Sequence, residues 1–300
     1  MTSPIPYLVK GDLIQIISTA RKITLEEVEP AKNILESWGF KVAYGENLFK
    51  SHNQYAGTDE ERLNDFQSAI DNPKVKAVLC ARGGYGTLRI IDDINWNSFL
   101  KTPKWIVGFS DITVLHLHLN TLNIPSIHAT MPILFEQKGN ENALTTLKNT
   151  LFGKSQDVQF PFQSFNTLGE IKGEIIGGNL SIINQLIGTP SFPDLNEKIL
   201  FIEDLDEYLY HIDRMMYQLK RAGVFSKIKG LIIGHMSEMN DNTVPFGKSA
   251  LEIIKEHTQE YDFPIAFNCP IGHQANNQAV VCGKEIMLSV SQKGSLLSYI

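Results

Sequence analysis

The sequence lacks the features of several large classes of protein. No apolar run approaches the ~20 residues of a membrane-spanning helix, and residues 1–6 lack the charged start and apolar run of a signal peptide. Cysteine is scarce: Cys80, Cys269 and Cys282 have no paired close spacing, which favours neither a disulfide framework nor a zinc ribbon. We therefore expect a soluble, cytoplasmic protein that holds no metal.

The sequence also lacks a block of basic charge. Its 27 lysines and arginines are scattered among 33 acidic residues, which gives a formal net charge of −6. A general nucleic-acid binder usually carries a basic patch, so we expect no nucleic-acid partner. What the chain has is apolar content: 43% of its 300 residues are hydrophobic, enough for a substantial core and about two domains.

Strand-like and helix-like segments alternate through the first half of the chain. Capping patterns that start at Thr24 and Thr58 open two helices, and a further helix is expected at Thr87–Ile91. Repeated strand–helix units predict a mostly parallel sheet with helices on both faces, and its ligand site lies outside the carboxyl ends of the strands. The expected strands are Leu13–Ile17, Lys41–Tyr44, Lys74–Cys80 and Trp105–Gly108.

A polar stretch divides the chain. We predict an N-terminal α/β domain at residues 1–135, a connection at 136–170 with one weak helix at Ala143–Leu151, and a C-terminal domain at 171–300. Strands expected in the last part are Ile171–Ile176, Ile199–Glu203, Gly230–Gly234, Pro264–Asn268, Ala279–Cys282 and Ile286–Val290.

Ser110 stands between a predicted strand, Trp105–Gly108, and a predicted helix, Ile112–Leu119. Such a turn presents a hydroxyl at the carboxyl edge of a sheet, where it can attack a carbonyl, and free N–H groups of the helix can receive the oxyanion. The segment lacks the second glycine of a G-x-S-x-G elbow. On this pattern alone, a helix cap by Ser110 or Asp111 is the better interpretation.

A glycine-rich turn, Arg82–Gly86, follows the strand that ends at Cys80. Glycine lets the backbone adopt positive φ and approach a ligand closely. One amide of this turn and that of Asp111 could form an oxyanion hole, and Arg82 could bind a carboxylate. A simple tight turn is the alternative, and the spacing does not match the common nucleotide-binding loops.

A serine nucleophile needs a base, and the base needs a partner that orients it. Glu203 closes an apolar run and could accept the Nδ1 proton of a histidine, although a helix-terminal charge or a metal cluster would also explain the acids that follow it. His273 lies in a polar loop, which suits a site residue. For the other histidines, a packed or solvated role is the default.

The sequence resembles the LD-carboxypeptidase (muramoyltetrapeptide carboxypeptidase) family, which includes the microcin-immunity serine peptidases. The resemblance extends over almost the whole chain. The segments that carry it are Lys10–Ile14, Tyr55–Arg62, Ala81–Gly86, Gly108–Thr113, Glu203 and Asp204 with Ile212–Arg214, and Ile271–His273.

The resemblance implies a Ser–His–Glu triad of Ser110, His273 and Glu203, with the backbone N–H groups of Gly84 and Asp111 as the oxyanion hole. In fold it implies an α/β protein: an N-terminal parallel-sheet domain similar to the class I glutamine amidotransferases, and a smaller, β-rich, swivelling C-terminal domain. It also implies a homodimer without a cofactor.

The activity implied is release of the C-terminal D-alanine from cytoplasmic murein tetrapeptides in cell-wall recycling. Arg82 and Tyr85 are candidates for contact with this substrate. Their turn looks closer to the murein branch than to the microcin-immunity branch, which cleaves peptidyl or aminoacyl nucleotides. Three alternatives stay open: the microcin-immunity activity on peptidyl or aminoacyl nucleotides, a thiol nucleophile at Cys80, and a non-catalytic protein that binds wall peptides.

Overall fold

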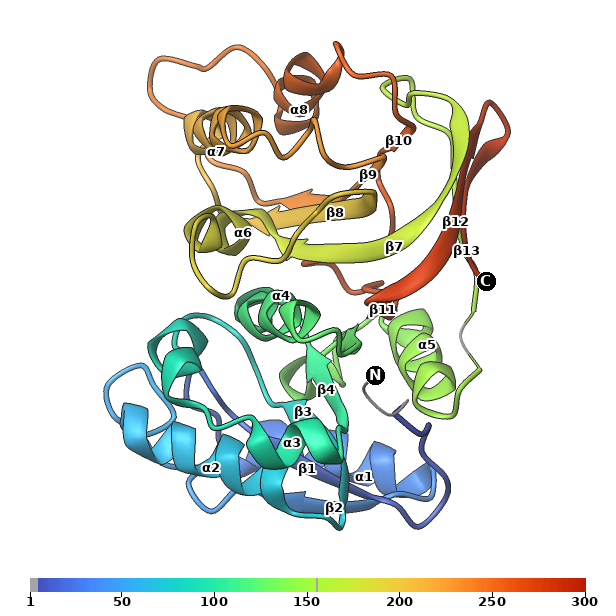
Figure 1. The fold of residues 1–300 in the computed structure, drawn as a ribbon. Coiled ribbons are helices and arrows are strands. Elements are labelled where there is room, and N and C mark those ends of the chain that lie inside the picture. Colours follow the sequence, from blue (N-terminus) through green and yellow to red (C-terminus); the bar gives the residue numbers. More distant parts are fainter. Residues whose placement is uncertain (1–4, 155) are drawn as a thin grey trace.

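Two β-sheets, one in each half of the chain, organise the molecule (Figure 1). The computed structural model describes residues 5–154 and 156–300. The six strands of the first sheet are β1 (Leu13–Ile17), β2 (Lys41–Tyr44), β3 (Val75–Cys80), β4 (Trp105–Gly108), β5 (Ser126–His128) and β11 (Val280–Cys282). The seven of the second are β6 (Val158–Phe160), β7 (Gly169–Asn179), β8 (Lys198–Leu205), β9 (Gly230–Ser237), β10 (Ile265–Ala266), β12 (Lys284–Ser291) and β13 (Gly294–Tyr299).

The first sheet has the strand order β11-β5-β4-β3-β1-β2, and all pairs except β11–β5 are parallel. Both predicted capping boxes are present: the hydroxyls of Thr24 and Thr58 accept the N–H groups of Glu27 and Glu61, whose carboxylates bond back. Caps of this kind contribute about 1 kcal/mol each. The helices of this half are α1 (Leu25–Ser37), α2 (Asp59–Asp71), α3 (Asn97–Lys101), α4 (Thr113–Thr121) and α5 (Glu141–Leu151).

The second sheet is mixed, with the order β10-β9-β8-β7-β12-β13-β6. Strands β7 to β10 are parallel, and β12, β13 and β6 continue the sheet in antiparallel fashion. Helices cover its parallel part, as parallel strands require for burial (Figure 1). They are α6 (Leu180–Leu186), α7 (Leu209–Arg221) and α8 (Ala250–Thr258).

The two halves are joined by more than the connecting chain. Helix α4 lies between the two sheets (Figure 1). The Thr113 hydroxyl at the start of α4 accepts the N–H of Asn179 at 2.9 Å, where β7 ends. In addition, β11, from the C-terminal part of the chain, belongs to the first sheet, where it pairs antiparallel with β5. The carboxyl ends of β4 and β8 therefore face each other across a fixed junction.

Several stretches differ from the sequence prediction, and α3, β5, α8 and β13 were not predicted at all. The helix expected at Thr87–Ile91 is two 3₁₀ turns, η1 (Thr87–Arg89) and η2 (Ile91–Asp93). The helix after Ser110 begins with a 3₁₀ turn, η3 (Ser110–Ile112), before α4. Within the expected connection 136–170, the helix is present as α5, but β6 was not predicted, because it is only three residues long and gains its stability from pairing with β13.

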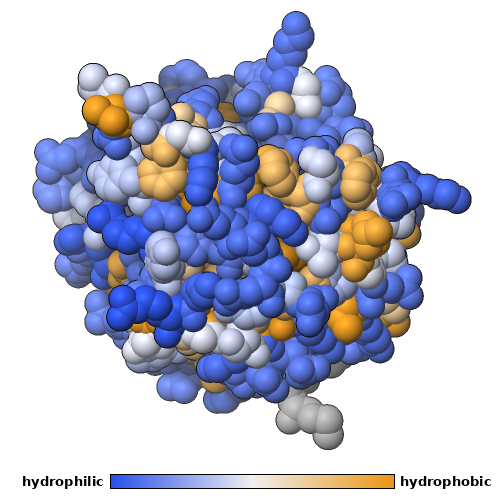
Figure 2. Space-filling model, turned by 90° about the horizontal axis from the view of Figure 1, so that it is seen from above, coloured by the Kyte–Doolittle hydropathy of each residue, from blue (hydrophilic) through white to orange (hydrophobic). Residues whose placement is uncertain are grey.

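The face seen from above in Figure 1 is mostly hydrophilic, with hydrophobic side chains in small, separate patches (Figure 2). Isolated apolar residues on a surface are normal. Among the described residues, no helix combines the length and apolar character needed to cross a bilayer.

Candidate active site

Ser110 lies where β4 turns into α4, as the sequence predicted. Its backbone φ is +63°, a left-handed value that costs a non-glycine residue about 1–3 kcal/mol. The side chain makes no helix-cap hydrogen bond. Instead, its Oγ lies 3.1 Å from Nε2 of His273. The cap interpretation is therefore wrong for Ser110, and the strained turn directs its hydroxyl at a histidine from the other half of the chain.

The glycine-rich turn after β3 packs directly against Ser110. A Cβ added at Gly83 would lie 2.9 Å from Cβ and 3.0 Å from Oγ of Ser110, so only glycine fits. The next residue, Gly84, has φ +112°, which also favours glycine. Neither the N–H of Gly84 nor that of Asp111 donates to a backbone carbonyl in the described part of the chain. Two uncommitted donors thus flank the hydroxyl.

The side chain of Asp111 ties the two turns together. It is buried, and its Oδ2 accepts the N–H of Thr87 at 2.8 Å, just beyond the glycine turn. Burial raises the pKa of the Asp111 carboxyl, against the lowering effect of its bonds to Thr87. This contact spans 24 residues of sequence and holds the glycine turn in register with Ser110.

His273 occupies the loop that follows β10, and both of its ring nitrogens have partners. Nε2 faces Ser110, and Nδ1 lies 2.6 Å from Oε2 of Glu203. The imidazole is 4.9 Å from the ring of Phe109 between centroids. Its main-chain oxygen accepts the Ser237 hydroxyl at 3.0 Å. The structure therefore joins Ser110, His273 and Glu203 into one chain of contacts.

Glu203 lies in β8 and is fully buried. Gly272 packs on it so closely that a Cβ there would lie 2.7 Å from Oε2 of Glu203. Gly234 of β9 flanks the same side chain, with a hypothetical Cβ 3.1 Å from that of Glu203. The side chain of Glu203 is thus held between two glycines, and Oε2 points at His273.

The charge around His273 sets its basicity. Burial alone would lower the pKa of the imidazole, but the charge and hydrogen bond of Glu203, helped by Asp204 and Glu238, outweigh it and raise the pKa above its ordinary value. A basic imidazole that accepts from a hydroxyl is suited to removing the proton of that hydroxyl.

The acids that follow Glu203 have other partners. Asp204 accepts the N–H of Ser181 at 2.9 Å and the amide of Asn179 at 2.8 Å, at the start of α6. Burial, together with the charge of Glu203, raises the pKa of Asp204 to about 7. Glu207 pairs with His211 at 2.7 Å. Among residues 5–154 and 156–300, no group of three or more histidine, cysteine or acidic side chains is arranged to hold a metal.

Cys80 does not fit the role of a thiol nucleophile. It ends β3 and is fully buried, and burial raises the pKa of its thiol to about 12. A thiolate, the reactive form, is therefore scarce at neutral pH. His116, on α4, is also buried and bonds to Ser126 at 2.8 Å, and burial lowers its pKa to about 4. These are packed groups.

The two residues expected to contact the substrate, Arg82 and Tyr85, lie in the glycine turn beside the site. Nη1 of Arg82 donates to the carbonyl of Lys22 at 3.1 Å. Tyr85 is exposed, with its ring 6.3 Å from that of Tyr55. Both belong to the glycine turn, so they lie beside the uncommitted donors, as their position in sequence predicted.

The sequence interpretation missed a residue that shapes the histidine loop. Asn277 is fully buried, and its Oδ1 accepts the N–H of Gly272 at 2.9 Å. This bond closes the loop around His273 and supports the positive φ of Gly272, +112°. An asparagine four residues after a glycine-histidine pair is the only signal in the sequence.

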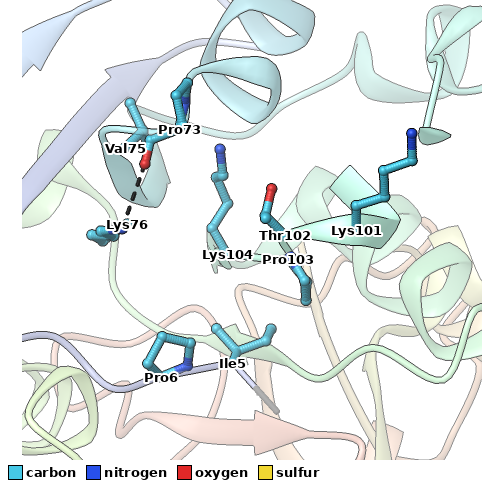
Figure 3. A pocket seen from close by; sticks show the side chains of 9 residues that line it. All are labelled: Ile5, Pro6, Pro73, Val75, Lys76, Lys101, Thr102, Pro103 and Lys104. Carbon is cyan, nitrogen blue, oxygen red and sulfur yellow. Dashed lines mark hydrogen bonds between the residues drawn. The ribbon is translucent and has the colours of Figure 1, made fainter. Parts of the chain in front are cut away.

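A cavity of about 340 Å³ lies at the opposite end of the first sheet, beside the start of β3 (Figure 3). It is flanked by Lys104, whose ammonium donates to the carbonyls of Ile70 and Asn72 at 2.7 Å each and so caps the end of α2. Burial lowers the pKa of Lys104 to about 8. Lys104 precedes β4 and Ser110 follows it, so this cavity is separate from the triad.

Comparisons with known proteins match both halves of the chain. Residues 14–129 match the LD-carboxypeptidase N-terminal domain, and residues 172–288 match the LD-carboxypeptidase C-terminal domain. A probable murein peptide carboxypeptidase of Bacillus subtilis is 32% identical over 96% of this chain and 92% of its own length. The murein tetrapeptide carboxypeptidase of Pseudomonas aeruginosa is 27% identical, with 92% of each chain covered.

Solved structures show the same fold. A muramoyltetrapeptide carboxypeptidase from Oxalobacter formigenes superposes with a TM-score of 0.88 at 28% identity, covering 96% of this chain and 98% of its own. The Microcin C7 self immunity protein MccF has the same TM-score at 19% identity, which shows the fold alone. Since both domain models match in order along the chain, this protein belongs to the LD-carboxypeptidase family of serine peptidases.

Proposed function

We propose that this protein is a cytoplasmic, homodimeric LD-carboxypeptidase that releases the C-terminal D-alanine of murein tetrapeptides in cell-wall recycling. The observation that carries the proposal is the chain of contacts from Ser110 through His273 to Glu203, with distances of 3.1 and 2.6 Å. Each member comes from a different element, and Ser110 lies in the other half of the chain from its two partners.

The first half of the reaction is attack by Ser110. Nε2 of His273 accepts the Oγ proton as the hydroxyl adds to the carbonyl carbon that precedes D-alanine. Glu203 holds the Nδ1–H and stabilises the imidazolium that forms. The N–H groups of Gly84 and Asp111 donate to the oxyanion. One such donor is worth roughly 3–4 kcal/mol of transition-state stabilisation.

The second half returns the proton. The imidazolium of His273 protonates the departing amine of D-alanine as the C–N bond breaks, which leaves the shortened peptide as an ester on Ser110. Water then attacks this ester with His273 again as the base, and the serine is regenerated. No cofactor is needed for either step.

Release of free D-alanine from a purified murein tetrapeptide tests the proposal. We expect wild-type protein to release D-alanine and a tripeptide in equal amounts. Stoichiometric binding of intact tetrapeptide without release would select a binding protein instead. Cleavage of an aminoacyl nucleotide, with the tetrapeptide untouched, would select the microcin-immunity activity.

The pH dependence of this reaction follows from His273. The imidazole must be neutral to act as a base, so kcat/KM should rise with pH as His273 loses its proton. Because Glu203 raises the pKa of His273, we expect the midpoint of this rise above the ordinary histidine value. A pH profile of kcat/KM on the tetrapeptide measures it. A midpoint below the ordinary value would contradict the charge balance inferred for the site.

A further inference from the structure

The proposed leaving group, D-alanine, is a single residue that carries a carboxylate. One residue spans only about 3.8 Å between successive Cα atoms, so a group that recognises this carboxylate must lie next to the scissile bond. Residues of the glycine turn beside Ser110, and side chains packed on that turn, meet this condition. A cation among them would supply charge-assisted hydrogen bonds to the carboxylate.

Arg21 has such a position. It follows β1, and its backbone N–H donates to the carbonyl of Gly83 at 3.4 Å. Its side chain lies flat across Gly84: a Cβ added at Gly84 would lie 2.6 Å from Cδ and 2.7 Å from Nε of Arg21. Gly83 in turn contacts Ser110. The side chain of Arg21 is therefore linked to the nucleophile through the glycine turn, since it packs on Gly84 and the adjacent Gly83 packs on Ser110.

The guanidinium of Arg21 is also uncommitted. Within residues 5–154 and 156–300 its side chain makes no hydrogen bond, ion pair or ring contact, and the residue is exposed. The nearby arginines are engaged. Arg62 is buried and donates to the carbonyls of Thr19 and Gly57 at 2.9 Å each, and Arg89 makes a two-pronged contact with Asp59.

Arg82 has a different role in this arrangement. Its Nη1 donates to the carbonyl of Lys22, the residue directly after Arg21, and so links the glycine turn to the segment that carries Arg21. Lys22 is a further exposed cation, but neighbouring residues of an extended segment point to opposite sides. Among the residues that the structure describes, Arg21 is thus the free cation that lies over the glycine turn itself.

We propose that Arg21 is the specificity residue that binds the C-terminal carboxylate of the substrate through its guanidinium. The assignment rests on the proposed carboxypeptidase activity. A planar guanidinium forms two parallel hydrogen bonds to a carboxylate, which fixes the terminal residue over Gly84 and restricts cleavage to the last peptide bond. Arg21 acts on the bound substrate and takes no part in proton transfer.

Two matched substrates test this inference: a murein tetrapeptide with a free terminal D-alanine, and the same peptide ending in D-alaninamide. For Arg21→Gln we expect kcat/KM on the free acid to fall about 10- to 100-fold, with little change on the amide. Arg21→Lys keeps the charge but not the two parallel N–H donors of the guanidinium, so its kcat/KM on the free acid should lie between those of Arg21→Gln and the wild type. Lys22→Gln, which removes the same charge one residue away, is the control and should leave the ratio of the two substrates near the wild-type value.

An equal loss of kcat/KM on both substrates for Arg21→Gln would overturn the inference, because it would indicate a structural role. A selective loss confined to Arg82→Gln would also overturn it and give the carboxylate to Arg82. If wild-type protein released neither D-alanine from the free acid nor D-alaninamide from the amide, the proposed function would fail, and the inference with it. If wild-type protein released D-alanine but Arg21→Gln lowered kcat/KM equally on both substrates, the proposed function would stand and only the role of Arg21 would be overturned.

Discussion

Ser110→Ala is expected to lower kcat for D-alanine release by at least about 10⁴-fold, since loss of a triad nucleophile leaves only binding and the oxyanion donors to act. The fold should survive. The lost oxygen is half-buried at the domain junction, and its one hydrogen bond goes to His273. Alanine has the same steric difficulty as serine at φ +63°, so the melting temperature should change little. The rate of D-alanine release measures the loss of activity, and thermal unfolding measures whether the fold survives.

Ser68→Ala is a matched control for this change. Ser68 lies exposed on α2, and the substitution removes the same hydroxyl away from the site. We expect wild-type turnover from it. If Ser110→Ala instead kept more than a tenth of the wild-type rate, another group would have to be the nucleophile. Cys80 could not replace it without a rearrangement, because its thiol is buried with a pKa of about 12.

The positions of the site residues along the elements were predictable from the sequence. Ser110 and Glu203 follow from apolar runs that end at a sheet edge, and the glycine turn follows from its composition. These are local signals, and local signals determine where a strand stops. They do not determine which strand ends lie close together in the fold. From the sequence, the pairing of Ser110 with His273 therefore depended on the family resemblance, and the structure shows the contact itself.

Two features that the sequence did not predict, the strand β6 and the place of β11 in the first sheet, depend on contacts between distant residues. Strand β6 exists because β13 pairs with it, and β11 joins the first sheet although it belongs to the last quarter of the chain. The buried bond from Gly272 to Asn277 requires the loop to fold back on itself. The partners of β6 and β11 lie outside the window in which periodicity and capping patterns operate. The bond from Gly272 to Asn277 spans only five residues, but it lies in an irregular loop that those patterns do not describe.

Glu203→Gln is expected to lower kcat by about 10⁴-fold, by analogy with the loss of the carboxylate in other serine triads. The isosteric amide still fits between Gly234 and Gly272, so the packing should be preserved. The chemistry changes, because an amide no longer stabilises the imidazolium and can present N–H to Nδ1 of His273, which favours the wrong tautomer. Steady-state kinetics on the tetrapeptide measures the loss.

The same variant should also move the pH profile. Glu203 is the chief group that raises the pKa of His273, while burial lowers it. With Glu203 neutral, burial dominates, and the rise of the residual kcat/KM should shift to lower pH. Asp204→Asn is the control. Asp204 is the adjacent buried acid, but its oxygens bond to Asn179 and Ser181 instead of His273. We therefore expect kcat of this variant to stay within about tenfold of the wild-type value, the range of a modest electrostatic change. Equal losses in the two variants would mean that the buried charge as a whole, and not the bond from Glu203 to His273, supports the base.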